Sequence, residues 1–357
     1  MRRISSVLLF TALAPALLAS CAVPPPAASR RPSSIARDLA RLPPFEAAVV
    51  GTIHKAHLLQ RDYPLAVLGE ILEAYQPDLV LVEIRPRPFA QSRFEDGPFE
   101  MTYVTQLARE RRITVVPIDR WSRRDLTRKP PRVHPADRAA LHAVVAPLMS
   151  AFRWPPTFAD VHSARFTRAY LHALTARARF EAGNATWNAR QAWFHAQATD
   201  AILLYRPRRV LAFVGAEHRP ELVSHLWQLG AELSDPVRLL GQRRVVPSDL
   251  AGRAAPADVV ALWQAGVERL RAQAPMARGP MRRALREKLR YFEVAVEQKG
   301  RCCVTPGALV PPPDQEPPPV DAPRPGVAPP AKRSAPPAPA TPATPATPAP
   351  PATPPAP

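Results

Sequence analysis

Apolar residues recur along this chain in two patterns, short continuous runs and helical periods, which alternate between residues 45 and 300. The continuous runs are rich in Val, Leu and Ile, and such runs are typical of buried strands. They are FEAAVVGT (45–52), DLVLVEI (78–84), ITVVPID (113–119), the Val210–Val214 part of RRVLAFVGAEH, and VRLLG (237–241). The pattern therefore predicts about five strands.

Helical spacing fills the intervals between these runs. After the first run, Asp62 and Pro64 predict a helix start, and Pro77 ends the apolar stripe that follows. Further helices are expected at FEMTYVTQLARER (99–111), from about 135 to 205 with breaks near Pro147 and Pro155, at PELVSHLWQL (220–229), and twice before residue 300. Strands that alternate with helices predict an α/β domain with a largely parallel or mixed sheet flanked by helices.

The two ends of the chain have other compositions. Residues 1–20 have a basic start and a short apolar segment, which predict a signal peptide, and the small residues before Cys21 resemble a bacterial lipoprotein box. We expect lipid on Cys21, a Pro- and Ser-rich spacer over 21–42, the α/β domain over 43–303, and a disordered Pro-, Ala- and Thr-rich tail over 304–357. The protein would then be exported and membrane-anchored, at the outer membrane or periplasmic face of a Gram-negative cell.

Charge and cysteine content change this picture little. The net charge is +18, but the arginines are scattered and no groove-reading motif is present, so we expect no specific nucleic acid partner. Cys302 and Cys303 are neighbours, and because a bond between neighbours is strained we expect free thiols or intermolecular bonds instead.

Candidate chemistry lies where the strands end. The first run is followed by His54, the second ends at Glu83 and Arg85, the third at Asp119 and Arg120, and the fourth at Glu217 and His218. Because ligands bind at the carboxyl ends of parallel strands, these side chains should share one rim. Imidazole with carboxylate suits Zn, Mn, Fe or Co. Gly51 and Gly215 would leave the backbone open to a cofactor.

Structural roles are open for the same residues. His54 and His218 would serve equally well as polar strand ends, Glu83 as an ion-pair partner of Arg85 or Arg120, and Asp119 as part of an Asx turn. The remaining histidines lie on predicted helices or loops, and we expect them to be surface or packing residues without partners: His57, His142, His162, His172, His195 and His225.

Four short motifs, taken in order, resemble the TraB/PrgY/Tiki superfamily: GTIH, PDLVLVE, VVPIDR and RRVLAFVGAEH. The resemblance covers residues 47 to 229. Its relatives include GumN proteins, haem-binding ChaN lipoproteins and erythromycin esterases. The resemblance implies an α/β fold and a metal-dependent protease activity of a Mn or Co type. It places metal ligands at His54, Glu83 and His218 and a functional Arg at Arg190. This chain reads HRPEL from His218 onward, whereas many relatives have a small residue and a glycine after the motif histidine.

These observations predict an exported, lipid-anchored, metal-dependent hydrolase that acts on a peptide or an ester. Glu83, Asp119, Arg120 and Arg190 are the expected catalytic residues, with Glu83 as general base if it is not a ligand. A binding lipoprotein for haem or metal, without catalysis, is the alternative, and a structural envelope protein is a third possibility. The sequence leaves the substrate and the oligomeric state open.

Overall fold

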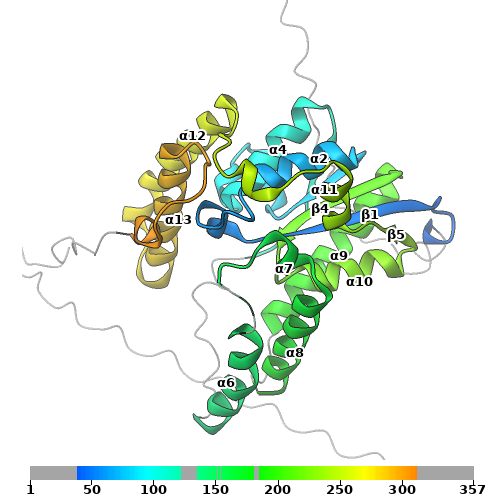
Figure 1. Cartoon of the computed structure of the whole chain (residues 1–357), viewed down its shortest axis with the longest axis horizontal. Coiled ribbons are helices and arrows are strands. Elements are labelled where there is room, and N and C mark those ends of the chain that lie inside the picture. The colour runs from blue at the N-terminus through cyan, green and yellow to red at the C-terminus, as the bar shows by residue number, and fades with distance from the viewer. Residues whose placement is uncertain (1–37, 122–134, 151, 153, 181–184, 312–357) are drawn as a thin grey trace, which may run out of the picture. The chain divides into compact units, whose positions relative to one another are not determined.

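A computed structural model describes residues 38–121, 135–150, 152, 154–180 and 185–311. Its centre is a five-stranded, entirely parallel sheet with the order β3-β2-β4-β1-β5. Figure 1 shows β4, β1 and β5 of this sheet side by side. The strands are β1 (Phe45–Thr52), β2 (Leu79–Val82), β3 (Thr114–Pro117), β4 (Arg209–Gly215) and β5 (Ala231–Leu233). The predicted α/β class with a parallel sheet is confirmed.

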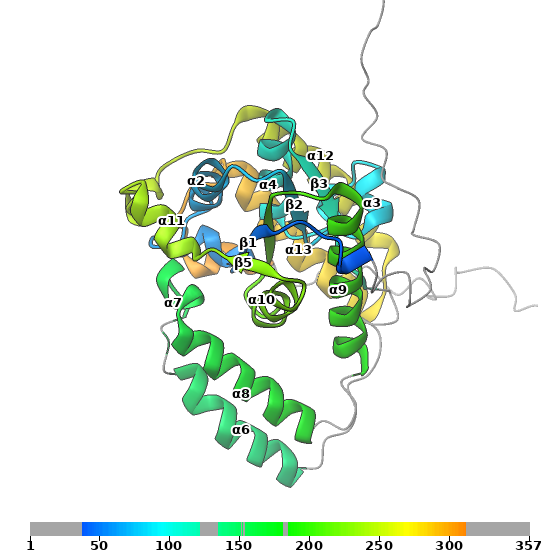
Figure 2. The ribbon, with the colours of Figure 1, turned by 90° about the vertical axis from the view of Figure 1, so that its right-hand side faces the viewer.

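Alternate residues of each strand face two separate cores. Ala48 and Val50 of β1 pack with α2 (Ala66–Tyr75) and α4 (Phe99–Glu110), whereas Ala47 and Val49 face α9 (Ala185–Tyr205) and α10 (Arg219–Gln228). Figure 2 shows these helix pairs on opposite faces of the sheet. Burial on both faces explains why the strands are continuous apolar runs.

Two further helices pack on α4 through aromatic side chains. The ring of Phe99 lies 5.6 Å from that of Trp263 in α12 (Ala257–Gln273) and 6.4 Å from that of Phe292 in α13 (Gly279–Glu297). The predicted stripe of α13 supplies Phe292 to the core. This contact places α13 where it can border the carboxyl ends of the strands.

The long helical stretch differs in part from its prediction. It consists of α6 (Pro135–Ser150), α7 (Phe158–His162), α8 (Ala164–Phe180) and α9, so the break near Pro155 is confirmed. The break near Pro147 is wrong, because Pro147 lies inside α6. Pro147 is exposed. The carbonyl that loses its helical hydrogen bond because of this proline can therefore bind water, and the helix continues through the proline.

The strand predicted at VRLLG (237–241) is also wrong. This segment is the helix α11 (Pro236–Gln242), and β5 lies earlier, at Ala231–Leu233. Asp235 caps the helix, since its carboxylate accepts from the Val237 N–H at 2.9 Å, and Pro236 occupies the first turn. Asp before Pro is a helix start, and it outweighs a short apolar run that fits either structure.

Short helical segments complete the described chain. They are the α-helix α3 (Pro86–Ala90) and the 3-10 segments η1 (His54–Leu58), η2 (Phe94–Asp96), η3 (Pro247–Leu250), η4 (Ala274–Met276) and η5 (Pro306–Leu309). Leu309 is buried in the core, past the expected start of the tail at residue 304. Within the described ranges, no helix combines the length and apolarity needed to cross a membrane. The predicted signal peptide, Cys21, the predicted spacer up to residue 37 and the predicted tail from residue 312 lie outside them.

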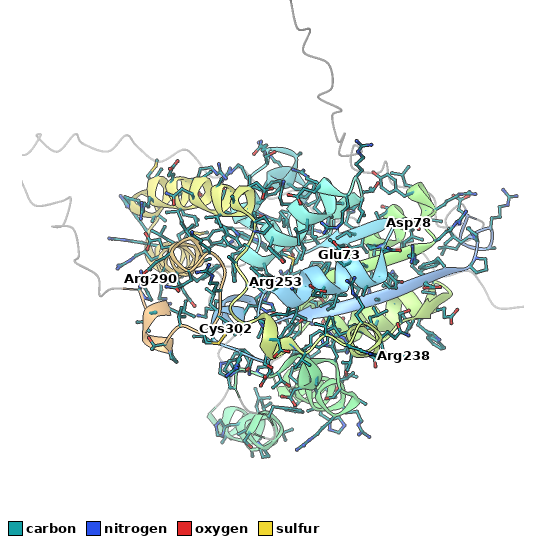
Figure 3. All side chains as sticks on the ribbon, turned by 45° about the horizontal axis from the view of Figure 1, so that its top comes forward. Glu73, Asp78, Arg238, Arg253, Arg290 and Cys302 are labelled. Carbon is teal, nitrogen blue, oxygen red and sulfur yellow. A yellow bond between two sulfur atoms is a disulfide. The ribbon has the colours of Figure 1, made fainter. Side chains whose placement is uncertain are left out.

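A disulfide joins Cys302 and Cys303 (Figure 3), so the expectation that these neighbours would not bond to each other is wrong. That expectation weighed strain alone and left out the packing of the segment. The Cys302 N–H donates to the Ala251 carbonyl at 3.0 Å, and the Val304 N–H donates to the Leu58 carbonyl at 2.9 Å. These bonds hold the backbone on both sides of the pair.

Candidate functional site

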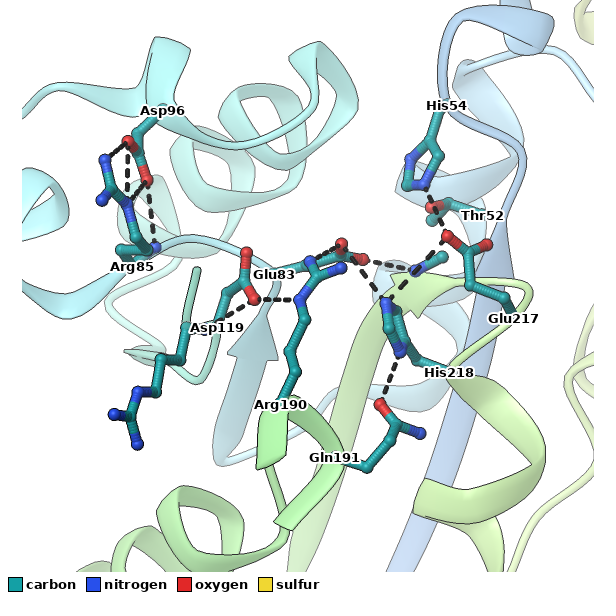
Figure 4. A network of polar contacts seen from close by, with 12 residues as sticks. Thr52, His54, Glu83, Arg85, Asp96, Asp119, Arg190, Gln191, Glu217 and His218 are labelled. Atoms are coloured by element: carbon teal, nitrogen blue, oxygen red, sulfur yellow. Dashed lines mark hydrogen bonds and ion pairs between the residues drawn. The ribbon is translucent and has the colours of Figure 1, made fainter. Parts of the chain in front are cut away.

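The strand order brings both glycine–histidine motifs to adjacent strand ends. β1 pairs with β4 so that Thr52 stands opposite Gly215, and β2 lies on the other side of β4. Figure 4 shows His54, Glu83, Asp119, Arg190, Glu217 and His218 grouped around this rim. The prediction that strand-end residues converge therefore describes the arrangement of these side chains.

His54 begins η1 directly beyond β1. Its φ of 51° is left-handed, which is uncommon for a residue other than glycine and costs about 1 to 3 kcal/mol. The ring Nδ1 lies 2.8 Å from Glu100 Oε1, and Nε2 lies 3.6 Å from Glu217 Oε1. About a third of the side chain is exposed. The surrounding contacts hold the backbone of His54 in this strained conformation, with Nε2 of the ring toward the rim.

Glu100 of α4 is the buried partner of His54, and sequence reasoning missed it. It is fully buried and also accepts from Thr52 Oγ1 at 2.9 Å. Burial would lower the pKa of His54, but Glu100, and after it Glu217, raise this pKa well above its ordinary value. Burial would raise the pKa of Glu100, but His54 lowers it. Without a metal the two therefore form an imidazolium–carboxylate pair, and a metal at Nε2 would displace the proton from that nitrogen.

His218, at the N-terminus of α10, has the opposite character. It is fully buried, and the ring lies 4.5 Å from that of Trp187 in a parallel stack. Its Nδ1 lies 2.6 Å from Gln191 Oε1, so Nδ1 carries the hydrogen and Nε2 has a bare lone pair. Burial lowers the pKa of His218 to about 3, which keeps the ring neutral.

The bare Nε2 of His218 faces two carboxylates. It has no hydrogen-bond partner, and it lies 3.8 Å from Glu83 Oε1 and 4.0 Å from Glu217 Oε1. A lone pair facing carboxylate oxygens, with no donor between them, is unfavourable in a buried place. A cation at this point would satisfy His218 Nε2 and Glu217 Oε1 together.

Glu83 and Asp119 are held by one guanidinium from α9. Arg190 Nη2 lies 2.7 Å from Glu83 Oε1, and its Nε lies 2.7 Å from Asp119 Oδ1. The other Glu83 oxygen accepts from the Gly215 N–H at 2.6 Å. Burial raises the pKa of Asp119, although Arg190 opposes this, and Glu83 raises it further. Both carboxylates and Arg190 thus lie at the predicted rim.

The other two strand-end arginines lie apart from Glu83. Arg85 binds both oxygens of Asp96, with Nη2 2.5 Å from Oδ1, and its guanidinium lies 3.9 Å from the ring centre of Trp121. The Arg120 guanidinium lies 5.0 Å from the ring centre of Trp193, while its backbone N–H donates to Asp119 Oδ1 at 2.6 Å. Arg190, not Arg85 or Arg120, is the ion partner of Glu83.

The two motif glycines have different surroundings. A Cβ at Gly215 would lie 2.8 Å from both His54 Nε2 and Glu217 Oε2, so glycine is needed for these side chains to approach. A Cβ at Gly51 would lie 2.9 Å from Val161 Cγ1, so its space is filled by α7. Gly215 therefore borders the rim, whereas Gly51 borders protein.

Two histidines that we expected to lack partners hold the backbone around His54. His162 Nε2 accepts from the Gly51 N–H at 3.1 Å, and His57 Nε2 accepts from the Ile53 N–H at 3.3 Å. Both are buried, which lowers their pKa values to about 3 and about 4. As neutral acceptors they fix the end of β1, and the expectation that they would be partnerless is wrong.

The residues around Glu217 come near a metal geometry without reaching it. Among the described residues, no group of three or more His, Cys, Asp or Glu side chains is arranged to hold a metal ion. Donor atoms that share one transition metal lie roughly 3.0 to 3.4 Å apart. The separations of 3.6 and 4.0 Å from Glu217 Oε1 to the two histidine Nε2 atoms exceed the upper end of this range by about 0.2 and 0.6 Å.

The donor types and their supports nevertheless fit a metal. Each histidine offers Nε2 to the rim while its Nδ1 contacts an oxygen, Glu100 for His54 and Gln191 for His218. Such partners orient metal-binding imidazoles in proteins. Glu217 lies between the two rings, whereas both oxygens of Glu83 already have partners.

The fold and site define an α/β protein with a histidine–carboxylate rim at the carboxyl edge of a parallel sheet. No family model, no curated protein and no solved structure matches the chain. The resemblance to the TraB/PrgY/Tiki superfamily accordingly stays a prediction.

Proposed function

We propose that this protein is a metal-dependent hydrolase with its centre at His54, His218 and Glu217. The observation that carries the proposal is the bare, buried Nε2 of His218, which faces carboxylate oxygens and has no hydrogen-bond partner. The proposed ligand set replaces Glu83 by Glu217, because Glu83 is already bound to Arg190 and Gly215. The metal would be Mn, Co, Zn or Fe, which imidazole and carboxylate both suit.

A divalent ion held there would lower the pKa of water and polarise a carbonyl group of the substrate. The chain's own groups would handle protons and charge. Asp119 has a raised pKa and lines a cavity beside the rim, so it is the best candidate to accept and return a proton. Arg190 would hold Asp119 and Glu83 in place and offset their charge.

Metal content of the purified protein tests the proposal. We expect about one equivalent of a transition metal in the wild type, and strong loss in His54→Ala, His218→Ala and Glu217→Gln. His195→Ala is a matched control, because His195 stacks on His225 outside the rim. Equal metal content in the wild type and in the His54→Ala/His218→Ala double variant would refute the metal site.

The alternative is a binding protein for haem or metal without catalysis. The apolar cavity favours it, because aromatic walls suit a flat ligand and one of them, Trp187, stacks on His218. Added haem would then give a Soret band that weakens in His54→Ala and His218→Ala. Absence of a band in the wild type would exclude haem as the ligand.

Lipid anchoring at Cys21 and export are also part of the proposal, and they rest on the sequence of residues 1–22. Labelling of cells with a fatty acid analogue, followed by fractionation, tests them. The label and the membrane association should both be lost in Cys21→Ser. A labelled Cys21→Ser protein would contradict lipidation at this residue.

A further inference from the structure

A cavity of about 520 Å³ opens beside the histidine–carboxylate rim. One wall consists of Glu83, Asp119 and Arg190, and the facing wall is the side of α13 that carries Met281, Leu285 and Lys288. This volume lies within the range of small-molecule sites in proteins. The rim and the cavity therefore share their polar wall.

Most of the lining beyond that wall is apolar or aromatic. Trp121, Trp187, Met281, Leu285 and Tyr291 border the space. Trp187 also stacks on His218, so its ring links the cavity to the rim. An aromatic or branched apolar group of a ligand would be taken out of water here, with about 25 cal/mol gained for each Å² buried.

The acidic groups of the cavity already have cationic partners. Glu83 and Asp119 share Arg190, as described above. Asp96 is bound through both oxygens by Arg85, and Glu287 is bound by Lys55. Asp96 and Glu287 are thus each balanced by a cation, whereas Glu83 and Asp119 together have one, Arg190.

Two cations of the lining lack such partners. Lys288 Nζ donates to the backbone carbonyl of Asp96 at 2.5 Å, and the Arg120 guanidinium lies over the Trp193 ring. Within the described part of the chain, neither has a carboxylate oxygen within 4.0 Å. Burial lowers the pKa of Lys288, although Asp96, Glu95 and Asp119 oppose this. The cavity is thus apolar with spare positive charge.

We propose that this cavity binds a peptide whose C-terminal residue is aromatic, with the ring among Trp121, Trp187 and Leu285 and the carboxylate at Lys288 and Arg120. Only the statement that this ligand is a substrate rests on the proposed function. Hydrolysis would break the C–N bond of the amide before that residue. The hydroxyl of water would go to the acyl carbon, and its proton to the released amine.

Calorimetric binding to the full chain tests this assignment independently of catalysis. The probes are N-acetyl-alanyl-phenylalanine, its C-terminal amide, and N-acetyl-alanyl-alanine. A charge-assisted contact that the amide lacks should make the acid at least about tenfold tighter than the amide. The alanine probe should bind about tenfold or more weakly, because it lacks the ring.

Variants locate the contacts. Lys288→Gln and Arg120→Gln should each reduce the preference for the acid over the amide, and the double variant should abolish it. Arg283→Gln is the matched control, because Arg283 is an exposed cation of the same helix, and it should keep the full preference. Circular dichroism of each variant checks folding.

The outcomes separate the two proposals. Equal binding of acid and amide to the wild type, or no heat with any probe, would overturn the assignment of the cavity. A preference that survives in the double variant would overturn it as well. Tight, acid-selective binding in His54→Ala, without cleavage by the metal-loaded wild type, would support the ligand class and refute the hydrolase.

Discussion

Replacement of Glu100 by glutamine would test the buried pair that positions His54. The substitution keeps the shape of the side chain but removes the charge that faces His54 Nδ1 at 2.8 Å. A hydrogen bond to a charged group contributes about 1.5 to 3 kcal/mol, and a neutral one about 1 kcal/mol. His54 is 34% exposed, so we expect a loss of only about 1 to 2 kcal/mol at pH 7.

The pH dependence gives a sharper criterion. The folded-state pKa of His54 is raised above 6.5, so its contribution is complete below pH 6.5 and is lost as the pH rises through the raised pKa. One proton released in this way changes the free energy of unfolding by at most about 1.4 kcal/mol per pH unit. The exposure of His54 limits how far its pKa is raised, so this decrease should be confined to a narrower pH range above pH 7.

In Glu100→Gln this decrease should become much smaller, because the main group that raises the pKa of His54 is lost while burial, which lowers this pKa, remains. Urea unfolding between pH 7 and pH 8.5, in the presence of a chelator, measures the slope in both proteins. Glu110→Gln is the control, because Glu110 is an exposed carboxylate of the same helix. A variant that loses stability with rising pH as the wild type does would refute the pairing of Glu100 with His54.

Three further predictions concern neighbouring residues. Gly215→Ala should destabilise the protein by about 1 to 3 kcal/mol in urea unfolding, because the new Cβ would lie 2.8 Å from His54 Nε2. Gly241→Ala is the control and should not destabilise the protein, because a Cβ at Gly241 would meet open space. Below pH 6, the histidines with pKa values of about 3, 3 and 4 should make stability fall by about 4 kcal/mol per pH unit, and His162→Gln should remove about a third of this slope. Gln191→Leu should weaken metal binding about 10- to 100-fold in a metal titration, because Gln191 fixes the orientation of the His218 ring. Gln197→Leu, on the same helix, is the control and should leave the affinity unchanged. Equal metal affinities of Gln191→Leu and the wild type would contradict the role of Gln191 in orienting His218.

Part of the site was readable from the sequence because it depends on local signals. Each of the first four strands is a continuous apolar run, and Asp or Glu and His follow these runs directly. In a parallel sheet such positions fall on one edge whatever the strand order, so His54, Glu83, Asp119 and His218 were found. Arg190 was assigned from the family resemblance.

Helix residues of the site carried no comparable signal. Glu100 lies in a helix whose other inward residues are apolar, and one Glu in an amphipathic helix is ordinarily solvated. Gln191 and His162 likewise act through partners more than 25 residues away in the chain. Glu217 was visible as a strand end, but only its distance to the two imidazoles distinguishes it from Glu83.

The sequence by itself determined the first four strands, the class of fold and the kinds of side chain at the rim, because apolar runs and the residues that end them are local properties of the chain. The tertiary structure alone decided that β1 and β4 are neighbours and that α13 lines a cavity beside the rim. The physical reason is that pairing and burial depend on contacts between segments far apart in the chain. No local pattern records whether Glu100 meets His54, or whether His218 Nε2 is left without a partner.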